Sequence, residues 1–202
     1  VGLSGLSLAA HYELGQRIKE TAKVLGRKIA VVASGDLSHR LTQEGPYGYR
    51  EEGPEYDRRI MEVMGNGEFG KLLEFPEDFC EKAGECGHRS FTVMAGALDR
   101  QGVTAERLSY EGPFGVGYGI CTYEVDGRDL TRNFKEQYEE KEHERIRRLR
   151  EKEDAYVRLA RESIETYVRT GRKGELPKKL PEEMYTQRAG VFVSIKKEGQ
   201  LR

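Results

Sequence analysis

The chain has 202 residues, of which 34% are charged and 37% hydrophobic, and its formal net charge at pH 7 is -1. This balance lacks the basic excess on which nucleic-acid binding depends, and no run approaches the ~20 apolar residues that a membrane span needs. The three cysteines form no C-x-x-C pair, which argues against a disulfide framework and a self-sufficient thiolate zinc site. We therefore expect a cytoplasmic protein that binds neither nucleic acid nor membranes.

The first part of the chain has the pattern of an α/β domain. Apolar residues at helical spacing predict an amphipathic helix over residues 11–25, and Gly26 ends it. Residues 29–33 are a continuous apolar run with β-branched members, which predicts a strand that is buried on both faces. Ligands of open α/β sheets bind beyond the carboxyl ends of the strands, so a site is expected in the polar segment 34–39.

The remaining chain alternates helical, extended and charged segments. Further helices are predicted over residues 54–64, 69–73, 90–98 and 156–168. Residues 108–125 have an extended pattern around a loop at 112–115, and residues 191–195 alternate like a strand. Residues 134–154 are mostly charged, which is typical of a solvated helical connector.

The segment "SGDLSH" carries the first group of candidate functional residues. Asp36, Ser38 and His39 follow the predicted strand directly. An imidazole titrates near neutral pH and can act as an acid or a base at such a position. The alternative is that Gly35-Asp36 is only a turn and that Ser38-His39 caps the next helix.

The segment "AGECGHRS" carries the second group. Glu85, Cys86 and His88 lie just ahead of a predicted helix, where free N–H groups and the helix dipole stabilise an anion. Glu85 or Cys86 is therefore a candidate metal ligand. The alternative is that Cys86 is a small buried hydrophobic residue and that His88 is a polar residue with satisfied hydrogen bonds.

Two Gly-Pro-aromatic-Gly turns provide further candidates. Tyr47 belongs to the turn at residues 45–48 and Phe114 to the turn at 112–115. The pattern fits two independent turns and equally fits two turns that line one cleft.

Three longer segments resemble a known family. The segments "IAVVASGDLSHRLTQEGPYGYREEGPEYDRRI", "AGECGHRSFTVMAGALD" and "LSYEGPFGVGYGICTYEV" look like the C-terminal half of a LigB-like domain of the class III extradiol ring-cleavage dioxygenases, from the branch related to Memo proteins. The tail from "AYVRLARESIETYV" onward is similar to the opening of an AMMECR domain. Together they resemble AmmeMemoRadiSam system protein A in its fused form.

The resemblance implies a domain order and a fold class. Residues 1–127 would be the C-terminal half of a LigB-like α/β sheet domain, residues 128–153 a charged helical linker, and residues 154–202 the N-terminal part of an α+β AMMECR-like domain.

The resemblance also implies roles for individual residues. The family holds iron(II) with two histidines and one carboxylate, and His39 matches its acid/base histidine. Cys86, with Glu85 beside it, matches the carboxylate position, as in Memo proteins. The family's two histidine ligands lie in an N-terminal half that this chain does not contain, and His11 does not match them. The pocket for a substrate would be lined by Ser38, Asp36, His88, Tyr47 and Phe114.

Three functions remain open at this stage. The first is part of a non-haem iron oxidoreductase for a small aromatic, catechol-like substrate, in which this chain alone does not hold iron and is inactive. A thiolate in place of a carboxylate changes metal preference, so ring cleavage does not follow automatically. The second is a binding module that acts with a radical SAM partner, and the third is a scaffold in which both motifs are only turns.

Overall fold

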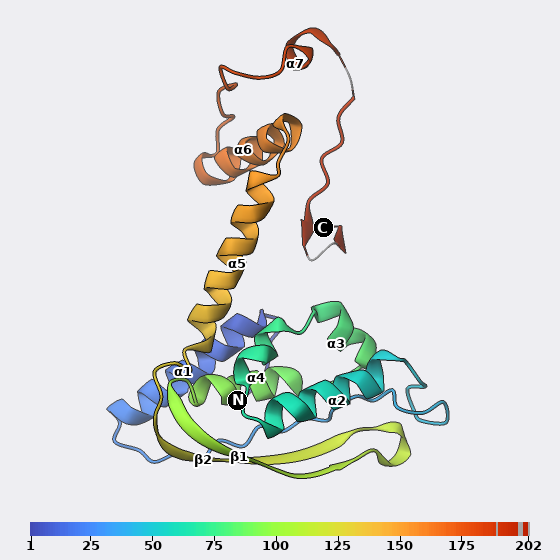
Figure 1. Ribbon diagram of the computed structural model, residues 1–202, viewed down its shortest axis with the longest axis vertical. Coiled ribbons are helices and arrows are strands. Elements are labelled where there is room, and N and C mark those ends of the chain that lie inside the picture. The colour runs from blue at the N-terminus through green and yellow to red at the C-terminus, as the bar shows by residue number, and fades with distance from the viewer. Residues whose placement is uncertain (189, 198–199, 202) are drawn as a thin grey trace. The chain divides into compact units, whose positions relative to one another are not determined.

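The computed structural model describes residues 1–188, 190–197 and 200–201 (Figure 1). The chain divides into two compact units, Val1–Glu140 and Lys141–Arg202. It is a mixed α/β structure with 49% helix. Within the described ranges, no helix combines the length and the apolar character that crossing a membrane would require.

The first unit contains a group of helices around an apolar core. The predicted helices are present with shifted ends, and a short helix that the sequence did not predict lies between them. Their bounds are α1 Leu8–Val24, α2 Glu52–Gly65, η1 Phe69–Glu74, α3 Glu77–Ala83 and α4 His88–Ala97. The core is formed by large side chains from these helices, with Tyr12, Tyr56, Ile60, Phe69 and Leu72 fully buried.

Helices α1 and α4 pack with their backbones in direct contact. Gly15 of α1 lies against the carbonyl of Val93, and Gly96 of α4 lies against the carbonyl of Tyr12. A Cβ atom at either glycine would overlap the backbone of the facing helix. Glycine therefore serves close helix packing here, although it lowers helix propensity.

An antiparallel hairpin completes the first unit. Strand β1 spans Gln101–Glu111 and β2 spans Tyr118–Arg128, with a short 3-10 turn, η2, at Pro113–Gly115. This confirms the predicted extended segments around the loop at 112–115. The hydroxyl of Tyr123 donates to the carbonyl of Met64 at 3.0 Å, which ties β2 to α2.

The predicted buried strand at residues 29–33 is wrong. These residues are not in a strand, and the side chain of Val32 is 87% exposed. A strand buried on both faces needs hydrogen-bonded neighbours, and the described residues offer no segment that pairs with it. Residues 29–33 instead border an open, mainly apolar cavity of about 1190 Å³.

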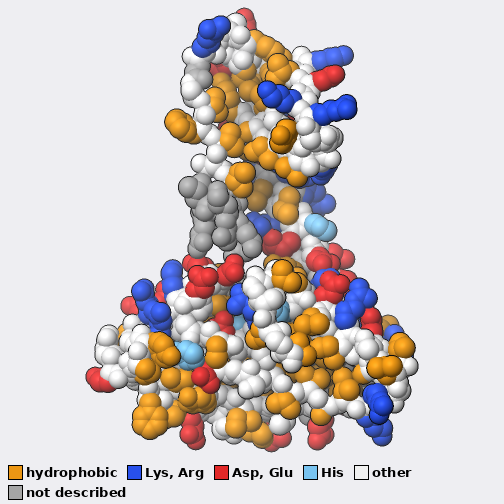
Figure 2. Space-filling model, turned by 180° about the vertical axis from the view of Figure 1, so that it is seen from behind, with side chains coloured by type: hydrophobic (Ala, Val, Ile, Leu, Met, Phe, Trp, Pro, Cys, Tyr) orange, Lys and Arg blue, Asp and Glu red, His pale blue; other side chains and the backbone are white. Residues whose placement is uncertain are grey.

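The second unit contains the rest of α5 and the elements after it. Their bounds are α5 Phe134–Glu151, α6 Ala155–Thr170, α7 Glu183–Thr186, β3 Lys196–Lys197 and β4 Gln200–Leu201. No described side chain of residues 141–195 is buried, and Figure 2 shows apolar side chains on the surface of this unit. The predicted strand at 191–195 is also wrong, because this segment is exposed and has no pairing partner among the described residues.

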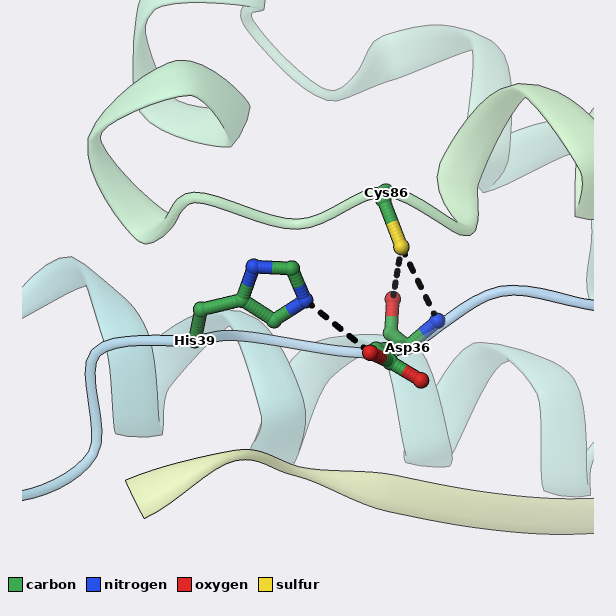
Figure 3. A group of neighbouring side chains, drawn as sticks. All are labelled: Asp36, His39 and Cys86. Carbon is green, nitrogen blue, oxygen red and sulfur yellow. Dashed lines mark hydrogen bonds and ion pairs between the residues drawn. The ribbon is translucent and has the colours of Figure 1, made fainter. Parts of the chain in front are cut away.

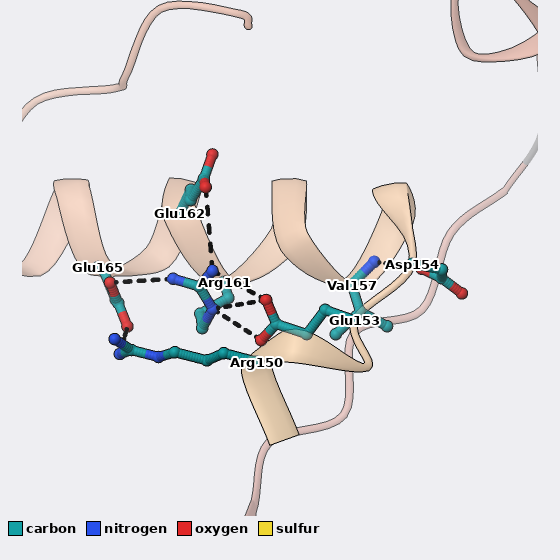
Figure 4. Close-up of polar contacts among 7 residues, drawn as sticks. All are labelled: Arg150, Glu153, Asp154, Val157, Arg161, Glu162 and Glu165. Atoms are coloured by element: carbon teal, nitrogen blue, oxygen red, sulfur yellow. Dashed lines mark hydrogen bonds and ion pairs between the residues drawn. The ribbon is translucent and has the colours of Figure 1, made fainter. Parts of the chain in front are cut away.

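Polar contacts connect the end of α5 to the start of α6 (Figure 4). The guanidinium of Arg161 donates to both carboxylate oxygens of Glu153, at 2.7 and 2.8 Å, and Arg150 donates to Glu165 at 2.8 Å. The side chain of Asp154 accepts from the N–H of Val157 at 2.8 Å and so caps α6. Helix α6 ends at Gly171, which has φ +67°.

Candidate functional site

The segment of residues 36–41 is held on two sides by backbone hydrogen bonds. The carbonyl of Asp36 accepts from the N–H of Gly87 at 3.0 Å. On the other side, the N–H of Leu37 donates to the carbonyl of Gly117 at 2.9 Å, and the N–H of Gly117 donates to the carbonyl of Ser38 at 2.8 Å. The sequence motifs at 34–39 and 83–90 therefore lie side by side, between α4 and the hairpin.

Asp36, His39 and Cys86 form one cluster (Figure 3). One potential ligand atom from each, a carboxylate oxygen, an imidazole nitrogen and the thiol sulfur, lies within 4.8 Å of the other two. The Nε2 of His39 is 3.2 Å from the Oδ2 of Asp36. The N–H of Asp36 points at the Sγ of Cys86 at 3.2 Å. Oxygen, nitrogen and sulfur donors at this spacing can bind one metal ion after small side-chain rotations.

The orientation of His39 does not fit a nucleophilic Cys-His-Asp triad. Figure 3 shows the Nε2 edge of the ring turned toward Asp36 and Cys86, and the Nδ1 edge turned away from them. A Cys-His-Asp triad needs opposite ring nitrogens on the cysteine and on the aspartate. Here the same nitrogen, Nε2, faces both partners, and it is hydrogen-bonded to Asp36.

Cys86 has surroundings that suit a metal-binding thiolate. It is exposed and lies two residues before the first residue of α4. Free N–H groups and the dipole at a helix start stabilise negative charge, and thiolate is the form of cysteine that binds metals. The other two cysteines are less accessible, since Cys80 is buried and Cys121 half-buried.

Glu85 lies beside Cys86 but has another role. Its Oε2 accepts from the N–H of His88 at 2.7 Å, so it caps α4. Burial raises the pKa of Glu85, and the N–H groups of His88 and Gly87 oppose that increase. Glu85 is not part of the group of three potential ligands.

The structure places His88 in the core. Its Nδ1 accepts from the hydroxyl of Tyr56 at 3.0 Å, and its Nε2 donates to the carbonyl of Leu72 at 2.8 Å. Only 1% of His88 is exposed, and burial lowers its pKa to about 4. The ring is therefore neutral near pH 7 and faces no open pocket.

Ser38 is also buried, and its side chain supports the loop. The hydroxyl donates to the carbonyl of Ala83 at 2.8 Å and accepts from the N–H of Arg40 at 2.9 Å. Ser38 therefore links residues 36–41 to the end of α3, and its hydroxyl is engaged with the backbone.

The two Gly-Pro-aromatic turns lie against each other. A Cβ atom at Gly45 would be 3.2 Å from the Cα of Gly115. Tyr47 stacks on the ring of His39 with centroids 5.1 Å apart. Phe114 is 90% exposed and has φ +58°, a left-handed conformation that costs a bulky residue ~1–2 kcal/mol. The strained backbone at Phe114 displays an aromatic side chain on a turn that touches the turn of Tyr47, and backbone strain of this kind is concentrated at functional sites.

Sequence reasoning missed Asp57 and Tyr110, which form a hydrogen-bonded pair next to the backbone of Ser38. Asp57 accepts hydrogen bonds from the N–H of Ser38 and the hydroxyl of Tyr110. A signal for Asp57 was present in the sequence, because it follows Tyr56 and precedes Ile60 on the apolar face of a predicted helix. A carboxylate at such a position needs internal hydrogen-bond partners.

Comparisons with known proteins relate the first unit to aromatic ring-opening enzymes. Residues 1–121 match the family described as the catalytic LigB subunit of aromatic ring-opening dioxygenase. The chain is 39% identical to protein CA_C1420 of Clostridium acetobutylicum over 197 residues, which are 95% of this chain and 41% of that protein. It is 26% identical to the 2-aminophenol 1,6-dioxygenase beta subunit of a Pseudomonas species over 129 residues, 59% of this chain and 42% of that relative. The chain thus spans about two-fifths of the length of these relatives.

Proposed function

Because the chain belongs to the LigB family of aromatic ring-opening dioxygenase catalytic subunits, we propose that it supplies part of a non-haem iron site of the extradiol type. The observation that carries this proposal is the convergence of Asp36, His39 and Cys86 within 4.8 Å. In this proposal Cys86 is the metal ligand and His39 the acid/base residue.

The side chains at the cluster fit a transition metal, but they differ from the two histidines and one carboxylate that the extradiol family uses to hold iron. Cys86 contributes a thiolate, and Asp36 contributes the nearby carboxylate. Of the other three histidines, His11 and His88 are buried with both ring nitrogens hydrogen-bonded, and His143 lies on α5. The described part of the chain therefore offers too few ligands for tight iron binding by itself, and the proposal assigns the two missing ligands to residues outside it.

The iron, when bound, would supply adjacent coordination positions for a catecholate and dioxygen. The residues of this chain would accept and stabilise the proton that leaves the substrate hydroxyl. The Nε2–H of His39 donates to the Asp36 carboxylate 3.2 Å away, which leaves the basic lone pair on Nδ1, and Nδ1 would take the proton of a substrate hydroxyl. Asp36 stabilises the charged imidazolium, and the stacked ring of Tyr47 keeps the imidazole in its orientation.

A substrate pocket for a small aromatic molecule is proposed at Tyr47 and Phe114. Both side chains are exposed, and they belong to turns that touch each other next to His39. Aromatic rings pack favourably in offset or edge-to-face arrangements, so these side chains suit a planar substrate. Replacement of Phe114 by glycine should weaken binding of a catechol without loss of fold, because glycine adopts φ +58° without strain.

Cobalt(II) titration tests the metal site, because a cobalt–thiolate bond gives a charge-transfer absorption band even when binding is weak. We expect the band in the wild-type chain and in Cys121→Ser, its loss in Cys86→Ser, and weaker binding in His39→Gln. A wild-type chain without this band, or a Cys86→Ser variant that retains it, contradicts the proposal. Oxygen consumption with catechols, measured on the protein at its native length, tests the reaction itself.

For residues 154–202 we propose the start of an AMMECR-like domain that acts with a radical SAM partner. The supporting observation is the exposed apolar surface of this segment, which includes Tyr167, Val168 and Phe192. In this second candidate function the LigB-like part is a binding module without turnover. Retention of a radical SAM protein in a pull-down, without oxygen consumption on any catechol, would favour it over the oxidoreductase.

A further inference from the structure

Asp57 is a buried carboxylate that touches the segment carrying the cluster. It lies on α2 and is 1% exposed. Its Oδ1 accepts from the N–H of Ser38 at 2.7 Å, and its Oδ2 accepts from the hydroxyl of Tyr110 at 2.8 Å. Both carboxylate oxygens are thus engaged, one with the residue before His39 and the other with strand β1.

Close packing around Asp57 leaves it little freedom. Gly117 presses against its carboxylate, and a Cβ atom there would overlap Oδ2. The same glycine exchanges backbone hydrogen bonds with Leu37 and Ser38. Asp57 is therefore enclosed by the loop and the hairpin, and a shift of its carboxylate would move both.

The electrostatics of Asp57 differ from those of an ordinary buried ion pair. No salt bridge involves Asp57 within the described part of the chain. Burial raises its pKa, while the Ser38 N–H, the Tyr110 hydroxyl and the charge of His39 act to lower it. Burial of a carboxylate without a paired cation is costly, and apolar packing alone would avoid that cost.

A second buried aspartate provides a comparison within the same unit. Asp99 is 2% exposed and accepts from the hydroxyl of Tyr12 at 2.8 Å, as Asp57 does from Tyr110. Asp99 is also paired with Arg100 at 3.1 Å. It has no contact with the cluster, so its network supports the fold between α1 and α4.

From these contacts we propose that Asp57 is a positioning residue of the site, which fixes the backbone of Ser38 so that the imidazole of His39 stays beside Asp36 and Cys86. This inference rests on the proposed function, since it assigns a purpose to the geometry of the cluster. Hydrogen-bonded residues around metal-site ligands commonly set their orientation, and their replacement costs about 10- to 100-fold in metal affinity.

Cobalt(II) affinity in matched variants tests the inference. Asp57→Asn keeps the shape of the side chain but removes the charge and one acceptor, and we expect about tenfold weaker binding with the thiolate band retained at saturation. Asp99→Asn is the matched control, which should bind within about twofold of the wild type because it perturbs an equivalent network away from the site. Equal weakening in both variants, or no change in Asp57→Asn, overturns the inference.

A metal-free readout separates this inference from the proposed function. The stacked Tyr47 should shift the His39 ring proton signals in NMR spectra, and His39→Gln assigns them. Loss of this ring-current shift in Asp57→Asn, but not in Asp99→Asn, supports the positioning role even if the wild-type chain binds no cobalt. Retention of the shift in Asp57→Asn contradicts the role. If Asp57→Asn does not fold, Tyr110→Phe replaces it with Tyr12→Phe as control, and the same outcomes decide.

Discussion

The two units of the chain are stabilised in different ways. In the first unit large side chains are fully buried, and buried polar groups such as Asp57, Asp99 and His88 have internal hydrogen-bond partners. In residues 141–195 no described side chain is buried, and ion pairs such as Arg161 with Glu153 connect the helices. A site with defined geometry needs the first kind of surroundings, because buried contacts hold side chains in place far better than exposed charges do.

Removal of a core side chain should produce the largest difference between the units. Phe69 is fully buried and packs edge-on against Tyr123 with centroids 5.0 Å apart. We expect Phe69→Ala to lower the free energy of unfolding by about 3–5 kcal/mol in urea denaturation. The control Val168→Ala, at a side chain that is 77% exposed, should change it by less than about 0.5 kcal/mol. Similar losses in both variants would mean that the units do not differ as described.

A change of pH should weaken the first unit through His88. Its pKa is about 4 in the folded chain and about 6.5 when unfolded, so the unfolded state binds more protons below about pH 6.5. Stability should therefore fall as the pH drops from about 6.5 toward about 4. Between about pH 7 and about pH 5, we expect the wild type to lose about 2 kcal/mol more than His88→Gln. The free energy of unfolding of both proteins is measured by urea denaturation at each pH. An equal change in the two proteins between about pH 7 and about pH 5 would refute the buried, neutral state of His88.

Loss of the cap of α6 should have a smaller effect, confined to the second unit. Asp154→Ala removes the acceptor for the N–H of Val157, which costs about 1 kcal/mol of local stability. Amide hydrogen exchange should become faster at the start of α6 and remain unchanged in α2 and α4. Asp154→Asn, which keeps a capping oxygen, should restore most of the protection. Faster exchange in the core helices as well would indicate that the two units are energetically coupled.

The smallest effect is expected from the Arg161 ion pair. The hydrogen bond from Arg161 lowers the pKa of Glu153, and the pair is partly exposed, with 26% of the Arg161 side chain and 11% of the Glu153 side chain open to solvent, so salt can weaken it. Arg161→Ala should accelerate amide exchange near residues 150–156 in low salt only, and Arg161→Lys should do so less. An effect that persists in high salt would show that the contact is structural rather than electrostatic.

The sequence predicted elements whose pattern is local. Helices α1, α2 and α6 and the hairpin follow from apolar spacing and from Gly26, Gly171 and the loop at 112–115. The apolar run at residues 29–33 was misread as a paired strand, because strand pairing depends on a neighbour that the run itself does not encode. The same reason applies to residues 191–195.

The candidate site shows the same difference between what a local pattern predicts and what contacts between distant residues decide. Residue type and the position before a helix identified Cys86, and Asp36 and His39 were identified because they follow an apolar run that was predicted to be a strand; His88 has the same local signature as Cys86 and lies in the core. Glu85 and Cys86 are neighbours in the sequence, yet one caps α4 and the other faces Asp36. Asp57 was not recognised, because its partners Ser38 and Tyr110 are 19 and 53 residues away.

The amino-acid sequence alone determined the helix faces, the turns and the set of chemically capable side chains, since these depend on residues within a few positions of one another. Only the tertiary structure decided which of these side chains meet. Convergence at the cluster depends on hydrogen bonds between residues 36–41, the loop at 86–87 and the hairpin, which are contacts between distant parts of the chain. Side-chain direction at such contacts is set by packing, which no local pattern specifies.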